Sequence, residues 1–375
     1  MQKEMTEQQW YAINNTDQLD TPALVVYLDR VKTNIQHAID IIADPARLRP
    51  HVKTHKTKEV SRLLMDAGVN KFKCATIAEA EMLGMLAAKD VLLAYQPFGP
   101  KLARLISLIR KYPDTRFSCL IDNLETAKNI SALASSEQLE LPVYIDLNVG
   151  MNRTGIQPDH CAIQLFEDAV KLNGIQLLGL HAYDGHIQQV PVQERETLCE
   201  EIFLMVESLK QELEKRGYQQ LNIIIGGSPG FPVYAKKPGV ECSPGTFVFW
   251  DKSYLDDLSE QGFLPAALVL SRVVSLPGST KVCMDLGHKS IAAERVLSQR
   301  GYFLNAPDFK VESQSEEHLV LDAAENHPWK IGDLFYVLPY HICPTCALYE
   351  AATLIEDRKA TASWKIIARD RKIFT

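Results

Sequence analysis

The chain has 375 residues, of which 46% are hydrophobic, and its formal net charge is −7. An acidic balance argues against a nucleic-acid partner, because phosphate backbones favour a basic protein surface. No stretch approaches the roughly 18 continuous apolar residues of a membrane-spanning helix, and the polar N-terminal segment has neither the apolar core of a secretory signal nor the Arg-rich character of a transit peptide. Eight scattered cysteines are too sparse for a secreted disulfide framework. We therefore expect a cytoplasmic protein.

Short apolar runs alternate with segments of helical periodicity through the first two thirds of the chain. Eight of these runs are predicted as strands, at 24–28, 48–53, 71–75, 91–95, 117–121, 143–147, 175–181 and 221–225. Gly, Pro or Asn marks most of the junctions between strand and helix. Eight β-then-α units in succession predict an α/β fold, a closed (β/α)8 barrel over residues 22–255. An open, doubly wound parallel sheet is the competing architecture.

The rhythm changes after about residue 255. Strand-like segments at 267–274, 281–285, 318–321 and 334–338 follow one another, separated by turn sequences and without a long helical pattern between them. Residues 256–375 are therefore predicted to form a second, mainly β domain.

Lys53 is the most unusual residue of the predicted barrel. It closes a strand in which Arg49, His51 and Lys53 alternate with neighbours that face outwards, so all three point into the barrel. A buried lysine is costly unless it is paired or chemically used. Desolvation and neighbouring cations make a neutral amine available for attack on an aldehyde. The alternative is a basic strand end that meets solvent or an anion.

Three further strand ends carry polar or glycine-rich sequences, where barrel active sites form. The loop Gly226–Gly230 offers backbone amides and the Ser228 hydroxyl to a phosphate, and a plain turn is the alternative. Arg153 and Tyr183 follow the strands at 143–147 and 175–181, and Tyr95 ends an earlier one. Each of these side chains could line the site or be packed or ion-paired instead.

A pair of potential metal ligands lies in the second domain, at His341 and Cys343. On an extended segment, residues two apart share a face and can ligate one ion. An imidazole with a thiolate suits Zn²⁺ better than Mg²⁺. Inert packing and a redox pair of Cys343 with Cys346 are the alternatives.

With these residues assembled, the chain resembles the D-threonine aldolase and D-serine dehydratase family, which are fold-type III pyridoxal enzymes related to alanine racemase. The resemblance spans nearly the whole chain. Its most specific marks are Arg49-Pro50-His51-x-Lys53-x-His55-Lys56, Gly150-Met151-Asn152-Arg153-x-Gly155, Ser243-Pro244-Gly245-Thr246-Phe247 and His341-x-Cys343-Pro344.

The resemblance implies a pyridoxal 5'-phosphate cofactor held by Lys53 as a Schiff base. By the same correspondence, His51, Arg153 and Tyr183 contact the cofactor, Gly227, Ser228 and Gly230 cradle its phosphate, and His341 and Cys343 bind a divalent metal, zinc rather than manganese. It also implies a homodimer, and a β domain that includes residues 1–21 in addition to 256–375. The function expected from it is a lyase acting on D-3-hydroxy amino acids.

The sequence departs from the aldolase pattern at the catalytic base. Gln189 stands where these enzymes carry a histidine, and His186 is the candidate to replace it. A metal pair with cysteine leans towards dehydration, so retro-aldol cleavage and elimination both stay open. Two rivals are an amino-acid racemase, which has no use for the His341 and Cys343 pair, and a non-catalytic cofactor-binding protein, which would lack the β domain. The roles of Asp285, Lys289 and His318 also stay open.

Overall fold

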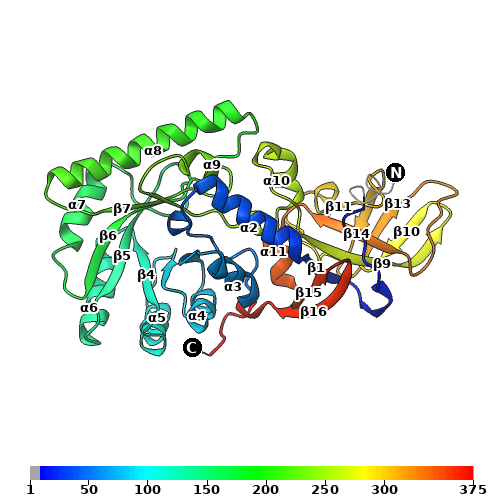
Figure 1. Ribbon diagram of the computed structural model, residues 1–375, viewed down its shortest axis with the longest axis horizontal. Helices are drawn as coiled ribbons and strands as arrows, with labels where there is room; N and C mark the ends of the chain where they lie inside the picture. The colour runs from blue at the N-terminus through cyan, green and yellow to red at the C-terminus, as the bar shows by residue number, and fades with distance from the viewer. Residues whose placement is uncertain (1–8, 375) are drawn as a thin grey trace. The chain divides into compact units, whose positions relative to one another are not determined.

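The computed structural model describes residues 9–374, which form two compact units. One unit comprises residues 36–53, 58–247 and 370–374, and the other comprises 9–35, 54–57 and 248–369 (Figure 1). The long helix α2 (Leu28–Ile42) runs from the second of these units into the first. No helix within 9–374 is both long and apolar enough to cross a membrane.

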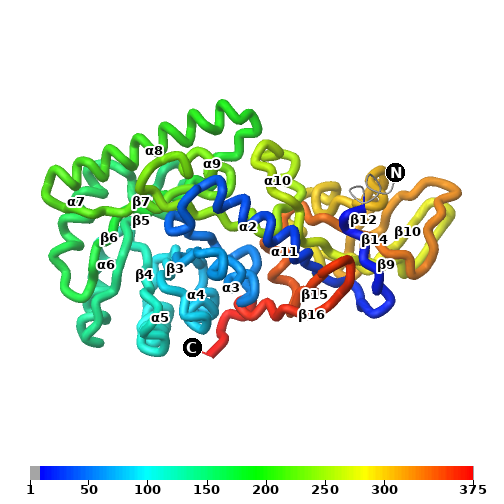
Figure 2. The backbone as a smooth tube through the Cα atoms, in the orientation of Figure 1, coloured from blue at the N-terminus to red at the C-terminus, as the bar shows by residue number. Residues whose placement is uncertain are grey.

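The first unit is a parallel β/α barrel. Its seven strands are hydrogen-bonded in sequence order. They are β2 (Lys71–Cys74), β3 (Asp90–Leu93), β4 (Arg116–Ile121), β5 (Leu141–Leu147), β6 (Ile175–Ala182), β7 (Asn222–Ile225) and β8 (Val240–Cys242). The backbone trace in Figure 2 shows the return helices that alternate with these strands. These helices are α3 (Lys58–Asp66), α4 (Ile77–Met85), α5 (Pro100–Lys111), α6 (Leu124–Ser136), α7 (His160–Ala169), α8 (Val192–Lys215) and α9 (Phe231–Tyr234).

Side-chain caps fix where several of these helices begin. Thr76 accepts a hydrogen bond from the Glu79 amide before α4, and Asn123 accepts one from the Thr126 amide before α6. Each cap satisfies an amide that the first helical turn leaves without a partner. Each cap lies two residues after the end of a strand, β2 for Thr76 and β4 for Asn123, so the change from strand to helix is short.

The segment around Arg49 closes the ring of strands. Leu48 bridges to Cys242 of β8, and His51 bridges to Lys73 of β2, both in parallel register. The amide of Arg49 donates to the Cys242 carbonyl at 2.8 Å, and the amide of Val52 donates to the Lys73 carbonyl at 2.9 Å. This segment therefore serves as the eighth parallel element, as the sequence predicts for residues 48–53.

Buried charge reinforces that closure. The Arg49 side chain is 0% exposed and forms ion pairs with Asp90 of β3 at 2.5 Å and with Glu241 of β8 at 2.7 Å. Lys71 of β2 pairs with the other oxygen of Glu241. The Arg49 guanidinium thus ties its own segment to β3 and β8 by holding two carboxylates, and Glu241 joins β2 to them through Lys71.

The second unit is a mainly β structure, as predicted. Its strands run in the order β12-β13-β10-β9-β1-β15-β16, and β14 pairs with both β9 and β11. They are β1 (Ala23–Tyr27), β9 (Ala267–Gly278), β10 (Lys281–Met284), β11 (Gly301–Phe303), β12 (Lys310–Gln314), β13 (Leu319–Asp322), β14 (Leu334–Pro339), β15 (Ala351–Glu356) and β16 (Lys359–Lys365). Two short helices belong here, α10 (Lys252–Asp257) and α11 (Ile342–Leu348). Tyr27, Leu268, Leu270 and Leu338 are among its buried core residues.

One predicted barrel strand is wrong. The run at 24–28 forms β1, which pairs with β9 and β15 in the mainly β unit instead of joining the barrel. Its uninterrupted apolar sequence is typical of any strand buried on both faces, so the pattern does not distinguish the two sheets. The missing barrel strand is β8, which has only three residues and contains Glu241. Of the described residues, 9–35, 54–57 and 248–369 group with the β unit, whereas the prediction was 1–21 and 256–375.

Removing the Arg49 guanidinium should destabilise the barrel. We expect Arg49→Leu to lower the free energy of unfolding by about 3–5 kcal/mol, because Glu241 and Asp90 would keep their charges without their partner. Urea denaturation of the purified variants measures this. Arg110→Leu is the matched control, since Arg110 pairs with Glu137 at the surface, where the side chains are 59% and 31% exposed, and it should cost about 1 kcal/mol or less. Equal losses in the two variants would contradict the assignment.

Candidate active site

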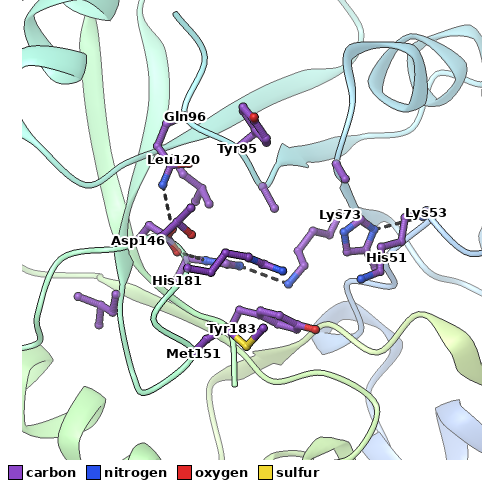
Figure 3. A pocket seen from close by; sticks show the side chains of 15 residues that line it. His51, Lys53, Lys73, Tyr95, Gln96, Leu120, Asp146, Met151, His181 and Tyr183 are labelled. Carbon is purple, nitrogen blue, oxygen red and sulfur yellow. Dashed lines mark hydrogen bonds and ion pairs between the residues drawn. The ribbon is translucent and has the colours of Figure 1, made fainter. Parts of the chain in front are cut away.

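A cavity of about 450 Å³ lies within the barrel unit, at the end where the parallel strands finish (Figure 3). Its volume is in the range of small-molecule and cofactor sites. The cavity is lined by His51, Lys53, Lys73, Ala75, Ala94, Tyr95, Gln96, Leu120, Asp146, Leu147, Met151, Arg153, Thr154, His181 and Tyr183. Five of the residues singled out in the sequence, His51, Lys53, Tyr95, Arg153 and Tyr183, are therefore brought together.

Lys53 lies in the turn that follows the closing segment of the ring. Its backbone amide donates to Nδ1 of His51 at 3.2 Å, which holds the turn, and its side chain is only partly buried. The amine lies 5.8 Å from the centre of the Tyr183 ring. Lys53 therefore presents a primary amine to the open cavity, next to the Tyr183 ring.

A second lysine, Lys73 of β2, lies deeper in the same cavity. Its Nζ is 3.2 Å from Nε2 of His181, and Nδ1 of His181 is 2.7 Å from a carboxylate oxygen of Asp146 (Figure 3). The Gln96 amide donates to the other Asp146 oxygen at 2.9 Å. The sequence analysis did not select Lys73, Asp146 or His181 as site residues.

Burial dominates the electrostatics of this chain of groups. It lowers the pKa of Lys73 to about 7, and the positive charge of Lys53 lowers it further, against the opposing effect of Asp184 and Asp146. Burial and the charge of Lys73 also lower the pKa of His181. Burial would raise the pKa of Asp146, but the bond to His181 keeps it below its usual value. At neutral pH, therefore, Asp146 is ionised and His181 is neutral, while Lys73 is close to its midpoint.

Tyr183 and Arg153 form the opposite side of the cavity. The Arg153 guanidinium lies 4.9 Å from the centre of the Tyr183 ring, within cation–π range. The loop that carries Arg153 is shaped by Asn148, whose side-chain oxygen accepts hydrogen bonds from the amides of Gly150 and Asn152. Gly150 and Asn152 adopt positive φ values of 123° and 52°, which a glycine and an asparagine tolerate best.

The glycine-rich loop passes close to this aromatic side. A Cβ placed on Gly227 would lie 3.3 Å from Cε2 of Tyr183, and one on Gly230 would lie 2.6 Å from Oδ2 of Asp184. The Gly227 amide donates to Oδ1 of Asp184 at 2.8 Å, and Ser228 is buried. None of the three residues predicted to cradle phosphate lines the cavity itself. The loop leaves room next to Tyr183, but the Gly227 amide already has a partner.

His186 does not join the cavity. Its side chain is exposed and lies against Gly150, where an added Cβ would come within 2.5 Å of Nε2. It is absent from the lining of the cavity. The structure thus brings Lys53 and Tyr183 together but leaves the predicted base outside.

The predicted metal pair lies in the mainly β unit. His341 immediately precedes α11 and Cys343 lies in its first turn, so the expected extended segment is wrong. The Cys343 thiol is 3.1 Å from the Thr54 hydroxyl, and Nδ1 of His341 bonds to Glu294. Burial lowers the pKa of His341, but Cys343 and Glu294 outweigh it and raise the pKa to about 9.

This donor set fits a divalent cation. An imidazole and a thiol lie together, and the carboxylate on Nδ1 leaves Nε2 of His341 as the ligating nitrogen. A carboxylate behind a metal-binding histidine is the usual way in which proteins orient the ring.

Two residues left open by the sequence have structural contacts in the β unit. Asp285 accepts hydrogen bonds from the hydroxyls of Thr21 and Ser271 and from the Arg272 amide. Lys289 pairs with Glu316 and Glu317 at the surface. These contacts explain both residues without a part in the chemistry.

Comparison with known proteins gives two family matches. The model described as alanine racemase, N-terminal domain, matches residues 26–252, and the "Putative serine dehydratase domain" matches residues 266–355. The chain is 27% identical to a D-threonine aldolase of Arthrobacter sp, over 94% of this chain and 93% of the relative. It is 24% identical to a D-serine dehydratase of Dictyostelium discoideum, over 90% of this chain and 94% of the relative. An alanine racemase of Caldanaerobacter subterraneus matches at 25% identity over only 54% of the chain.

Solved structures agree on the fold. The crystal structure of D-threonine aldolase from Filomicrobium marinum superposes with a TM-score of 0.87 at 24% identity, covering 96% of this chain and 97% of the other. A D-threo-3-hydroxyaspartate dehydratase from Delftia superposes with a TM-score of 0.82 at 22% identity, covering 93% and 97%.

The contacts of His341 allow a test of whether His341 and Cys343 form a zinc site. We expect Glu294→Gln to weaken Zn²⁺ affinity by roughly 10- to 100-fold, since the ring loses its orienting carboxylate, and His341→Ala to weaken it further. Titration calorimetry on the cofactor-free protein measures both. Glu317→Gln is the control, because Glu317 pairs with the exposed Lys289. Unchanged zinc affinity in His341→Ala would show that this pair is not a metal site.

Proposed function

This chain belongs to the alanine racemase N-terminal domain family, and we propose that it is a pyridoxal-phosphate-dependent lyase of D-3-hydroxy amino acids. The observation that supports this most is the Lys53 amine, which faces a cavity of about 450 Å³ beside the Tyr183 ring. The relatives that match over nearly the whole chain are named for D-threonine, D-serine and 3-hydroxy-D-aspartate, all amino acids with a β-hydroxyl.

The described residues fit the proposed cofactor. Lys53 would hold it covalently, Tyr183 would lie beside its ring and Arg153 would face its phenolate oxygen, with His51 fixing the turn of Lys53. Gly227, Ser228 and Gly230 would receive the phosphate. Because Asp184 already occupies the Gly227 amide, the contribution of Gly227 is the close approach that a missing Cβ permits.

The cofactor supplies an electron sink for the bonds at Cα. The protein's own part is to orient the substrate and to move protons. The Lys53 amine would be placed to exchange a proton at Cα of a bound substrate. We propose that His341 and Cys343 hold a divalent cation, zinc rather than manganese, which would supply Lewis-acid polarisation of a hydroxyl.

We further propose that the protein is a homodimer, in line with its resemblance to fold-type III enzymes. Closed two-fold dimers are the commonest assembly of soluble proteins. Sedimentation of the purified chain at several concentrations measures the mass, and a monomer throughout would contradict the proposal.

The covalent role of Lys53 has a spectroscopic test. We expect Lys53→Ala to lose the visible absorbance of a lysine-linked cofactor, because the variant lacks the amine that is proposed to attach it. Lys89→Ala, which removes an exposed lysine of the same unit, should keep the band. A band that persists in Lys53→Ala would place the attachment elsewhere.

The products distinguish the two lyase reactions. The protein, loaded with cofactor and zinc, is incubated separately with D-threonine and D-serine. Glycine with acetaldehyde from D-threonine would establish cleavage of the Cα–Cβ bond, whereas pyruvate with ammonia from D-serine would establish elimination. If neither appears and the α-hydrogen only exchanges with solvent, the lyase proposal fails and a racemase takes its place.

A further inference from the structure

The cavity contains two primary amines where the proposed chemistry assigns only one. The Nζ atoms of Lys53 and Lys73 lie 5.8 and 5.5 Å from the centre of the same Tyr183 ring. Lys73 reaches the cavity from β2 and is only 3% exposed. A lysine in such a place is expensive to keep charged.

The hydrogen-bonding partners of Lys73 define its state. Asp146 is held ionised and can only accept, so Nδ1 of His181 carries the hydrogen and Nε2 carries the lone pair. Nε2 therefore accepts a hydrogen from Lys73 at 3.2 Å. This arrangement holds the Lys73 nitrogen in place whether it is an amine or an ammonium, because both forms have a hydrogen to donate.

The charged groups around Lys73 leave it near its midpoint at neutral pH. Lys53 and Arg49 disfavour the ammonium form, Asp184 and Asp146 favour it, and burial is the largest effect. His181 contributes no charge, since its own pKa is lowered. Lys73 can thus both accept and return a proton within one catalytic cycle.

The proposed cleavage reaction needs such a group. One base must take the proton of the β-hydroxyl, and one acid must deliver a proton to Cα. Lys53 can serve Cα, but His186, the candidate for the hydroxyl, is exposed and outside the cavity lining. Resting on the proposed lyase function, we propose that Lys73 is the base that takes the β-hydroxyl proton, and that His181 and Asp146 position it.

The proposed cleavage step balances in protons and electrons. The neutral Lys73 amine takes the hydroxyl proton and becomes an ammonium, and the oxygen's electron pair forms the second carbon–oxygen bond of an aldehyde. The Cα–Cβ bond breaks, and its electron pair passes to Cα, where the electron sink accepts it. Lys53 then protonates Cα, which gives glycine, and Lys73 returns its proton to solvent through the open side of the cavity.

The first test uses wild-type protein without cofactor. Competitive acetylation at a series of pH values, read for each lysine by peptide mass spectrometry, should show Lys73 half-reactive near pH 7. Lys111, whose pKa the Glu81 carboxylate raises, is the reference within the same sample and should react only at higher pH. In Lys53→Met the midpoint of Lys73 should rise, because a neighbouring positive charge is gone. A Lys73 midpoint equal to that of Lys111 would overturn the proposal.

The second test separates the two proton transfers in the cofactor-loaded enzyme. Lys73→Met and Lys73→Arg should each reduce cleavage of D-threonine by about 100-fold or more, since general acid–base groups contribute on that scale and arginine cannot lose its proton. Both variants should keep the visible cofactor band. They should also keep the exchange of glycine α-hydrogens in deuterated water, followed by NMR, because that exchange needs only Lys53. His186→Ala should leave cleavage within a few-fold of wild type.

The outcomes are distinguishable. Loss of glycine exchange together with cleavage would overturn the role of Lys73 as hydroxyl base, as would a His186→Ala variant that loses cleavage while Lys73→Met does not. In wild type, the rate of cleavage should rise with pH through the Lys73 midpoint and fall as the pH drops below it. If D-threonine yields no glycine and D-serine yields pyruvate, the proposed role of Lys73 fails while the lyase stands. If neither substrate reacts, the lyase proposal fails, and the role of Lys73 as hydroxyl base fails with it.

Discussion

The ladder of hydrogen bonds on both sides of the segment 48–53 is the constraint on which the cavity depends. Arg49 donates to β8 and Val52 donates to β2, so the segment cannot slide without breaking both contacts. A shift of one residue would also turn every side chain to the opposite face, taking Arg49 from its two carboxylates and Lys53 from the cavity. Closure of the ring and placement of the reactive amine are therefore one structural requirement.

The same closure separates two kinds of positive charge inside the barrel. The buried Arg49 and the partly exposed Lys71 are paired with the carboxylates of Glu241 and Asp90. Lys53 and Arg153 lie nearer the strand ends, where the aromatic face of Tyr183 is their shared neighbour. Of these four described charges, those of Lys53 and Arg153 would be available to an anionic ligand with a phosphate and a carboxylate. Charges that are already paired inside a low-dielectric interior offer little to a ligand.

Site residues could be predicted from the sequence where they lie together in one continuous motif. Lys53 and its neighbours could be predicted because strand alternation places His51 and Lys53 on one face, and the mainly β unit followed from its turns. Three residues of the cavity were missed for a different reason. Lys73 belongs to a strand of two lysines separated by Phe72, a pattern typical of a half-exposed strand, and Asp146 is one acid in an otherwise apolar run. Only the closed ring shows that β2, β5 and β6 direct these side chains to one point.

Two predictions were wrong because the local sequence is compatible with two structures. β1 has a sequence suited to either sheet, and its partners are set by β9 and β15, which lie more than 200 residues further along the chain. Residues 341–344 follow a strand, yet Ile342, Cys343 and Pro344 form the first turn of α11, where a proline is tolerated. In both cases the local pattern permits two structures and distant contacts select one.

A barrel can supply a missing group from a strand other than the one that usually carries it, since all of its strands end around the same cavity. The loop after β6 holds His186 away from the cavity, against Gly150, while β2 extends Lys73 towards it from the far side of the ring. A lysine can replace a histidine as a base near neutral pH only if its ammonium form is penalised, and burial beside Lys53 provides that penalty. The carboxylates of Asp184 and Asp146 oppose this penalty, so the pKa of Lys73 does not fall further. A lysine in water would stay protonated, and one buried without these carboxylates would lose its proton too readily to return it.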